Sequence, residues 1–519
     1  MSGGTIEILI AMAVYMLAVI GIGLFFAKRS NQNSDNYFLG GRSLGPWIAA
    51  MSAEASDMSG WLLMGLPGVA YWCGLADATW TAIGLAVGTY LNWLLVSKRL
   101  RRYSAVADNS ITIPDFFSNR FHDKKKILMS IAALFILVFF TVYAASCFIT
   151  CGKLFSTLFG FSYTSMMIAG ALFVIVYTFL GGFLAESTSD FMQSIVMIIA
   201  LVAVLVVAVI TAGGSAQILE NIKGIPGFFE FFGMASPTTV DKVQQVSNGQ
   251  ALFGSALPYG FLTILSTLSW GLGYFGMPQV LLRFMAIRKV SELKTSRRIA
   301  TTWAVISMTA AVLIGIIGRV LYPVELLTSG ESESIFILLS TNLLPPLLAG
   351  LAMAGILAAT ISSSDSYLLI ASSAFSKNIF QGLLKKNATD KQVMTVSRIV
   401  LVLIAVIGML LAWDKSKVIF DVVSFAWAGF GATFGPIMLF SLFWKRTTLQ
   451  GAVAGMLAGG SMVFIWKLLI RPMGGVLGIY ELLPAFLVSC VFIIVVSLLT
   501  KEPSKEIQEE FEKAKTYEC

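Results

Sequence analysis

Polar residues interrupt this chain in two places where a membrane helix would carry leucine and valine. The run GPWIAAMSAEASDMSGWLLMGLPGVAYW contains the carboxylates Glu54 and Asp57. The run LAGLAMAGILAATISSSDSYLLIASSAF carries hydroxyls from Ser362 to Ser366, with Asp365 among them. An unpaired polar group in hydrocarbon costs several kcal/mol. Both runs must therefore face protein or water.

A cation is one partner that such interruptions suit. A helix that breaks inside a membrane frees backbone carbonyls on one side and N–H groups on the other, and the N–H side suits a substrate carboxylate. Sodium is a hard cation that prefers oxygen, so carbonyls of 55–58 and hydroxyls of Ser362 and Ser363 could hold it. No Lys or Arg stands inside an apolar run except near its ends. Asp57 therefore indicates a mobile cation.

Other interpretations of the same residues remain open. The serines could instead form structural hydrogen bonds between neighbouring helices. The coupling ion could be a proton, with Asp57, Glu54 or Asp365 alternating between charged and neutral forms. A histidine relay is excluded, because His122 is the only histidine and lies in a charged segment.

An aromatic group supplies a candidate slot for an organic solute. Trp270, Tyr274 and Pro278 lie in the segment SWGLGYFGMPQ, whose glycines would let the backbone loosen. The faces of Trp and Tyr could line an apolar pocket. The alternative is an interfacial aromatic belt beside a kinked helix end.

Membrane helices must position these groups. The 519 residues are 57% hydrophobic and 12% charged, with mean hydropathy +0.82, whereas soluble domains are about 25% charged. A water-soluble fold is excluded, and apolar runs long enough to cross about 30 Å recur throughout. The expected spans are 5–27, 45–73, 77–97, 127–155, 161–182, 190–213, 251–277, 299–322, 335–375, 393–413, 418–442, 449–470 and 480–499.

The basic residues fix the expected orientation. No Lys or Arg precedes the first span, so it should remain as a helix with its N-terminus outside. Of the 36 Lys and Arg, 27 then fall on the inside, as the positive-inside rule requires. The net charge of +8 is thus explained by the basic residues that gather on the inside, where they contact anionic lipid. We therefore expect no nucleic-acid partner.

The chain divides into one membrane domain, 1–500, and a tail, 501–519, on the inside. The tail should form an amphipathic surface helix or act only as a solubilising segment. The outside connection, 214–250, should be a short lid-like helix or a passive loop.

The motifs argue against other function classes. There is no H-E-x-x-H motif, and the five cysteines lack metal-ligand spacing, so we expect no enzyme. A channel also has polar helices, but channels rarely break helices in matched halves. A carrier is the favoured class.

Six motifs in order resemble the sodium/solute symporter family, and within it the bacterial sodium/proline symporters. The resemblance covers about residues 36–500. The motifs are SLGPWIAAMSAEASDMSGWLLMGLPG, TIPDFFSNRF, FFTVYAAS, YTFLGGFLAESTSD, WGLGYFGMPQVLLRFMA and FAWAGFGATFGP.

The resemblance implies the inverted-repeat fold of the bacterial leucine transporter. Two five-helix repeats, about 45–213 and 251–442, would follow one extra helix and precede two more. Their first helices would be the interrupted Asp57 segment and the Gly-rich Trp270 segment, at corresponding places in the two halves.

The resemblance also implies binding residues. Asp57 would lie close to a sodium ion. The sodium ligands would be the carbonyls of Ala55, Met58 and Ala359 and the hydroxyls of Ser362 and Ser363. The substrate pocket would use Ser59, Gly60, Tyr143, Trp270, Tyr274 and Pro278.

Some residues depart from the family pattern. Members carry an acid at the Asp190 position, and some bind a second sodium between it and nearby serines. Here Asp365 and Ser366 stand in that place, which suggests a second inner cation site formed by Asp190, Asp365 and Ser366. Glu54 and Glu186 are unusual as well.

The function that the resemblance implies is sodium-coupled uptake of L-proline by alternating access across a bacterial cytoplasmic membrane. Alternatives are sodium- or proton-coupled symport of another small solute, such as an amino acid, pantothenate or a sugar acid. A channel is a weaker alternative.

Overall fold

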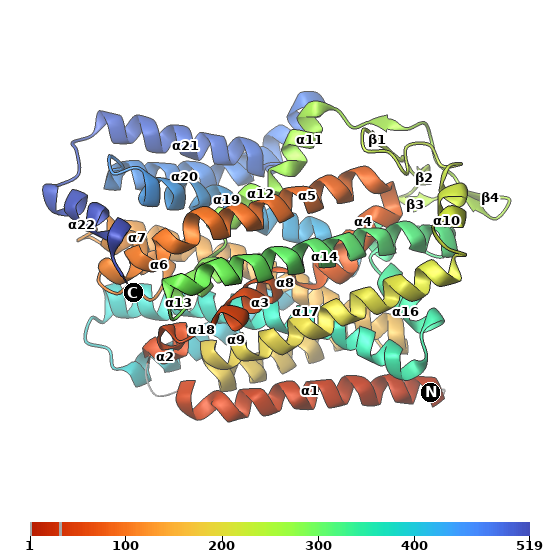
Figure 1. Ribbon diagram of the computed structural model, residues 1–519, viewed down its shortest axis with the longest axis horizontal. Helices are drawn as coiled ribbons and strands as arrows, with labels where there is room; N and C mark the ends of the chain where they lie inside the picture. Colours follow the sequence, from red (N-terminus) through yellow and green to blue (C-terminus); the bar gives the residue numbers. More distant parts are fainter. Residues whose placement is uncertain (1–2, 31–33, 519) are drawn as a thin grey trace.

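Long helices lie side by side along one direction of the molecule (Figure 1). A computed structural model describes residues 3–30 and 34–518. Among these residues, ten helices are long and apolar enough to cross a membrane. Three more spans are a shorter apolar helix, Tyr163–Phe179, and two helices that are broken near Asp57 and near Met277. The expected all-α membrane fold with about thirteen spans is confirmed.

The elements follow one another with short connections. The bundle contains α1 (Gly3–Ser30), α3 (Pro46–Asp57), η2 (Trp61–Gly65), α4 (Leu66–Cys73), α5 (Leu75–Leu91), η3 (Asn92–Val96), α6 (Ser97–Val106), α8 (Ile127–Phe159), α9 (Tyr163–Thr211), α11 (Phe261–Leu268), α12 (Trp270–Gly273), η4 (Tyr274–Gly276), α13 (Pro278–Ala286), α14 (Leu293–Leu321), α16 (Ile335–Leu343), α17 (Pro346–Ser373), η6 (Ala374–Leu384), α18 (Asp390–Leu411), α19 (Ile419–Phe443), α20 (Leu449–Ile465), η7 (Trp466–Ile470) and α21 (Leu482–Leu499). Shorter helices are α2 (Ser34–Leu39), η1 (Gly40–Arg42), α7 (Ile113–Arg120), α10 (Ser215–Ile222), η5 (Val290–Glu292), α15 (Ser329–Ser332), η8 (Arg471–Met473), η9 (Gly475–Gly478) and α22 (Lys505–Thr516). The strands are β1 (Gly233–Met234), β2 (Thr239–Val240), β3 (Val243–Gln244), β4 (Val246–Ser247), β5 (Gln250–Ala251) and β6 (Leu257–Pro258).

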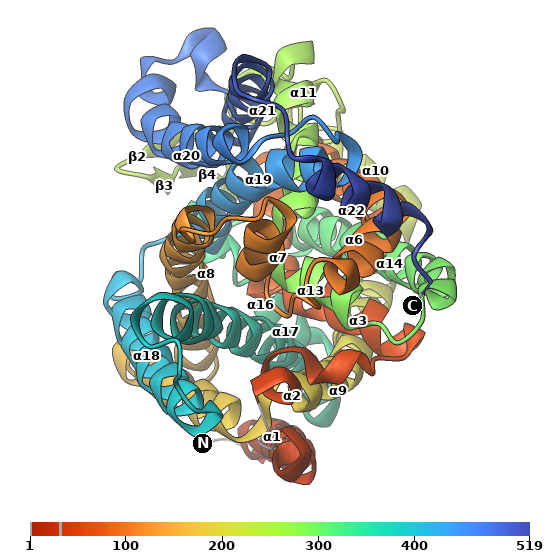
Figure 2. The same ribbon diagram turned by 90° about the vertical axis from the view of Figure 1, so that its left-hand side faces the viewer.

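The two ends of the bundle differ. We call the end that carries α10 and the strands the hairpin end, and the end that carries α22 the tail end (Figure 1). The strands pair antiparallel as β1–β6, β2–β3 and β4–β5. The segment expected as a lid-like helix or a passive loop thus contains one helix followed by small hairpins. Figure 2 views the tail end, with α22 lying across α6.

The first broken helix interrupts the run around Asp57. Pro46 starts α3, as proline does well in a first helical turn. The helix ends at Asp57, and the N–H of Met58 donates to the Glu54 carbonyl at 2.8 Å. Helical bonding resumes at Trp61. The break therefore lies inside the bundle, between two helical halves.

The second broken helix lies where the other repeat should begin. Met277 is extended, with φ −77° and ψ 108°, and Pro278 opens α13. The expected span 251–277 is displaced: strands and loops occupy its first ten residues, and helix runs from Phe261 to Ala286 around the break. Hydropathy placed the boundary wrongly because residues 251–260 are largely apolar although they form loops, the end of β5 and strand β6, and because the apolar run continues beyond Pro278.

The structure divides two further segments. Gly182, with φ 60°, breaks α9 between the expected spans 161–182 and 190–213, and this conformation is costly for residues with a side chain. The expected span 335–375 divides into α16 and α17 at Pro345 and Pro346. Proline lacks the N–H that a continuous helix would need.

Helices near the breaks approach closely through glycines. A Cβ atom added at Gly88 of α5 would lie 2.4 Å from the carbonyl oxygen of Gly271 in α12. Small residues allow such contacts between membrane helices. The second broken helix is therefore fixed against α5 through backbone contact.

The tail is docked onto the bundle. Phe511 of α22 is 4% exposed and packs edge-on against Tyr103 of α6, with ring centroids 6.1 Å apart. His122 lies 2.9 Å from the Glu510 carboxylate. The amphipathic-helix expectation fits this arrangement, and a purely solubilising role does not.

Candidate functional site

Four of the five expected sodium ligands meet at the first break. The Ser362 hydroxyl donates to the Ala55 carbonyl at 2.8 Å and to the Ala359 carbonyl at 3.3 Å. The Ser363 hydroxyl also reaches the Ala55 carbonyl, at 3.3 Å. All four residues are fully buried. The arrangement gathers oxygen atoms from α3 and α17 at the point where α3 ends.

Met58, the fifth expected ligand, ends α3 with non-helical backbone angles, φ −89° and ψ 79°. Its N–H bonds within α3. Its sulfur accepts from the Ser307 hydroxyl of α14 at 3.8 Å. Its carbonyl therefore belongs to the unwound stretch and not to a helix.

Asp57 is fully buried beside these oxygens. Its Oδ1 accepts from the Gln279 amide at 3.4 Å, and the Tyr274 hydroxyl faces the same carboxylate. Its Oδ2 has no hydrogen-bond partner. Among the described residues, no Lys or Arg forms an ion pair with Asp57. The carboxylate thus keeps a free oxygen inside the protein.

Two aromatic side chains touch the unwound backbone. Tyr143 donates its hydroxyl to the Asp57 carbonyl at 3.4 Å and stacks on Tyr367, with ring centroids 4.3 Å apart. The indole N–H of Trp61 reaches the same carbonyl at 3.3 Å. These contacts connect α8 and η2 to the break.

Trp270 stands at the centre of an aromatic cluster. Its ring lies 5.1 Å from Tyr480, 5.2 Å from Phe420, 5.9 Å from Trp427 and 6.4 Å from Trp61. Trp427 also donates its indole N–H to the Trp270 carbonyl at 2.8 Å. Aromatic pairs at such separations favour an ordered packing.

The remaining expected substrate residues lie at the two breaks: Ser59 and Gly60 at the first, and Pro278 at the second. The Ser59 hydroxyl is buried and has no hydrogen-bond partner. A Cβ atom on Gly60 would lie 2.4 Å from Thr150 Oγ1, so the backbone needs glycine there. Pro278 precedes Gln279, which contacts Asp57. The six expected substrate residues therefore surround both breaks.

A buried guanidinium contacts two of the three residues of the expected second cation site. Arg283 of α13 is 0% exposed and bonds Asp190 Oδ2 at 3.1 Å, Ser366 Oγ at 3.0 Å and Glu186 at 2.5 Å. Ser52 donates to Asp190 at 2.7 Å. The sequence did not predict this ion pair, although the apolar run VLLRFMA around Arg283 is a signal of burial.

Asp365 adds a third carboxylate to this cluster. Its Oδ1 accepts from the backbone N–H of Ser366 at 2.7 Å, and its Oδ2 has no hydrogen-bond partner. One oxygen each of Glu186 and Asp190 is also without a hydrogen-bond partner. Arg283 supplies one positive charge to three carboxylates.

Glu54 has no ion-pair partner among the described residues, and one of its oxygens has no hydrogen-bond partner.

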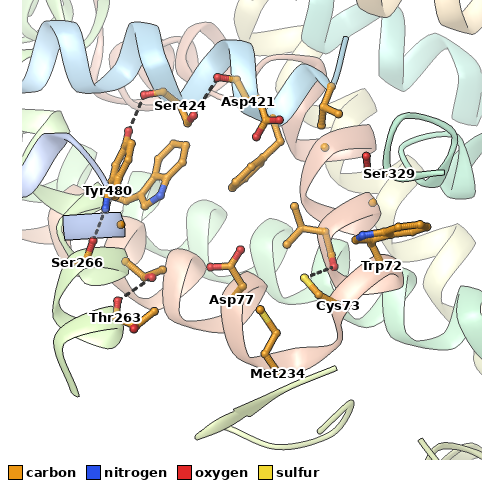
Figure 3. A pocket seen from close by; sticks show the side chains of 18 of the residues that line it. Trp72, Cys73, Asp77, Met234, Thr263, Ser266, Ser329, Asp421, Ser424 and Tyr480 are labelled. Carbon is orange, nitrogen blue, oxygen red and sulfur yellow. Dashed lines mark hydrogen bonds between the residues drawn. The ribbon is translucent and has the colours of Figure 1, made fainter. Parts of the chain in front are cut away.

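A cavity of about 460 Å³, drawn in Figure 3, is lined by Trp270 and by Met234 of β1 at the hairpin end. Asp77 of α5 and Asp421 of α19 point into it. Tyr480 closes one side, donating its hydroxyl to the Ser424 carbonyl at 2.6 Å while its own N–H donates to Ser266. Trp270 is the one expected substrate residue in its lining. It therefore joins the cavity to Trp61 and the break.

A buried ion pair lies at the edge of this cavity. Lys153 of α8 contacts Glu333 at 2.7 Å, and Glu333 also accepts the N–H groups of Ile419 and Phe420, each at 2.9 Å. Glu333 thus caps the first turn of α19 with a negative charge. Burial raises the pKa of Glu333, and Lys153 opposes that rise.

Several contact residues were not predicted individually. They are Trp61, Gln279, Arg283, Glu333, Trp427 and Tyr480. Most lie inside motifs that carried the family resemblance, so their type was visible. Their contacts were not, because they depend on how distant helices cross.

Buried oxygens and aromatics around two broken helices define a class: a sodium-coupled secondary transporter, and not an enzyme. The description "Sodium:solute symporter family" belongs to a family model that matches residues 37–459. The chain belongs to the sodium:solute symporter family.

Named relatives cover nearly the whole chain. It is 41% identical to the sodium/proline symporter of Escherichia coli K12, over 98% of this chain and 96% of that protein. It is 39% identical to the sodium/proline symporter of Staphylococcus aureus USA300, over 98% of this chain and 95% of that protein.

Solved structures share the fold. A sodium-coupled sialic acid symporter in a substrate-bound outward-open state superposes with TM-score 0.77 at 19% identity, covering 96% of this chain and 99% of that chain. Mhp1, a nucleobase-cation-symport-1 family transporter, gives 0.53 at 14% identity, covering 93% and 100%. The expected leucine-transporter type of fold is confirmed.

Proposed function

We propose that this chain takes up L-proline together with sodium by alternating access. The observation that carries the proposal is the cluster of Ala55, Ala359, Ser362 and Ser363 oxygens at the break in α3, in a chain 41% identical to a named sodium/proline symporter. One domain, 1–500, performs the transport, with repeats at about 45–213 and 251–442.

Sodium binds between α3 and α17 in this proposal. The carbonyls of Ala55, Met58 and Ala359 and the hydroxyls of Ser362 and Ser363 are its ligands. Hydroxyl hydrogens that donate to carbonyls when the site is empty can rotate, so that each oxygen presents a lone pair to the ion. Asp57, with its free oxygen, supplies negative charge nearby.

Proline binds across the two breaks in this proposal. Ser59 and Gly60 offer a hydroxyl and exposed backbone, while Tyr143, Trp270, Tyr274 and Pro278 offer ring surfaces. A five-membered ring packs on such faces, and its charged groups need the polar atoms of the unwound backbone. The cavity beside Trp270 is the route from the hairpin end.

A second cation binds near Asp190, Asp365 and Ser366 in this proposal. Arg283 neutralises one charge of the three carboxylates that include Glu186. Buried charge without a partner is costly, so the surplus favours a further cation. The ion would use the unpartnered oxygens of Asp190 and Asp365.

The hairpin end faces outside in this proposal, and the tail end faces the cytoplasm of a bacterial cell. The positive-inside rule supports this orientation, because 27 of the 36 basic residues lie in segments that would be cytoplasmic. The N-terminus is then outside and the C-terminus inside the cytoplasmic membrane.

Uptake of labelled proline into proteoliposomes tests the proposal. An inward sodium gradient should drive accumulation above equilibrium, and an ionophore that collapses the gradient should abolish it. Uptake that ignores the imposed sodium gradient would overturn sodium coupling.

The substrate and the carrier mechanism need separate controls. Unlabelled proline should compete, while pantothenate, sugars and other amino acids should not. Saturation and counterflow should occur, and counterflow separates the two classes, because a carrier exposes its site to one side at a time and a channel does not.

A further inference from the structure

Arg319 is a buried guanidinium that forms no salt bridge among the described residues, although the charge of the exposed Glu325 acts on it from a greater distance. It lies in the last turn of α14 and is 2% exposed. Among the described residues, no Asp or Glu lies within ion-pair distance of its side chain. Its partners are neutral: the Pro323 carbonyl at 3.2 Å and the side-chain oxygen of Gln244. Its Nε has no hydrogen-bond partner.

Two aromatic rings hold the guanidinium in place. Its central carbon lies 4.5 Å from the Tyr71 ring centroid and 4.8 Å from that of Phe253. The cation–π attraction of the two rings offsets only part of the cost of burying a charge. The positive charge of Arg319 is thus incompletely compensated.

A cavity of about 470 Å³ adjoins Arg319 at the hairpin end. It lies between α10, the β4–β5 hairpin and the end of α14, which share one corner of the bundle in Figure 1. Arg319 is the one charged side chain among the described residues that line it. The polar residues that line it are neutral: Asn221, Ser247, Asn248 and Gln250.

We propose that this cavity binds a singly charged anion, a halide or a small carboxylate, on Arg319. A guanidinium is a forked donor that matches such anions, and a desolvated one attracts an anion strongly. The amides and hydroxyls of the lining can donate further hydrogen bonds. A single arginine favours a monoanion over phosphate or sulfate.

The site lies apart from the proposed sodium and proline sites. It connects the hairpins to the outer half of the first broken helix, because Tyr71 of α4 stacks on Arg319 and donates to the Tyr322 carbonyl at 2.6 Å. An anion bound there would stabilise the folded protein by an amount that rises with the logarithm of the anion concentration once that concentration exceeds Kd.

Purified protein in detergent tests the site. Chloride or acetate is titrated at constant sodium concentration and ionic strength, against a large sulfonate as the replacement anion. We expect saturable broadening of the chloride NMR line and a matching rise in the thermal midpoint. Acetate that displaces chloride identifies a carboxylate-accepting site, and acetate without effect identifies a halide site.

Matched variants separate binding from general salt effects. Arg319→Gln should weaken anion binding about tenfold or more, while Arg298→Gln, on the same helix at the tail end, should not. Asn248→Asp places a carboxylate in the exposed hairpin and should also abolish binding without disturbing the bundle. No saturable effect of either anion in the unaltered protein, or equal binding by the Asn248→Asp variant, would overturn the proposal.

Discussion

Individual carboxylates in this protein differ chiefly in what neutralises them. Glu333 has a lysine and a helix terminus, and Glu186 and Asp190 share Arg283. Asp57 has an amide and a phenol, neither of which carries a positive charge. A carboxylate held by neutral donors is the one that gains most from a mobile cation.

Asp57→Asn should therefore weaken sodium binding by about tenfold or more, and substrate affinity should lose its dependence on sodium by the same factor. Sodium titrations at several proline concentrations measure both effects. Asp414→Asn, which removes a charge from an exposed loop, is the control and should leave both unchanged. Equal sodium affinities in the two variants would contradict the assigned role of Asp57.

Asp365→Ser addresses the second cation. Removing this carboxylate leaves Arg283 with two acids, so we expect fewer sodium ions to move per proline. Paired measurements of labelled sodium and proline flux give that ratio. Ser364→Ala is the control, because the Ser364 hydroxyl donates to the Thr360 carbonyl in its own helix. An unchanged ratio in Asp365→Ser would show that there is no second site there.

Among the elements, the continuous helices were predictable and the interruptions only partly so. Apolar runs of the right length identify spans such as α8 and α14, because hydrocarbon thickness sets their length. The polar residues around Asp57 marked the first break. Hydropathy could not separate the apolar strand β6 from α11, nor reveal that Arg283 is buried, because both depend on which segments pair in space.

The start of α19 depends on Glu333. Glu333→Gln should cost roughly 3 kcal/mol or more of stability, because Lys153 and two backbone N–H groups lose their anion. Thermal unfolding and proline uptake measure the loss. The charge-swapped pair Lys153→Glu with Glu333→Lys should not rescue it, because a lysine cannot accept from the N–H groups of α19. Full rescue by the swap would mean that the ion pair alone matters.

The two ends of the whole molecule differ. The hairpin end has an open cavity, and at the tail end side-chain contacts connect several helices. Arg283 joins α3, α9, α13 and α17, and α22 covers α6 (Figure 2). Hydropathy predicts a single membrane domain, and the distribution of basic residues predicts its orientation; both stay predictions. The sequence did not predict the docking of the tail, since amphipathic helices also lie free on membrane surfaces.

Phe511→Ala should loosen the tail. Losing this buried ring should cost roughly 2–3 kcal/mol of stability and let helix α22 unfold, so that trypsin can cleave after Lys513 and Lys515, whose side chains are already exposed. The rate of tail cleavage measures the effect. Tyr517→Ala, an aromatic residue that is 36% exposed, should leave cleavage unchanged. Equal cleavage rates in both variants would mean that Phe511 does not hold the helix.

The contact of Trp270 with Trp61 and Trp427 gives the protein an internal optical probe. Three of its eleven indoles lie close enough together for their emission to depend on one another and on the water in the adjoining cavity. Any rearrangement that separates the two broken helices changes that environment. The wavelength of the tryptophan emission should then report in real time whether the cavity beside Trp270 is open or closed, without an attached dye.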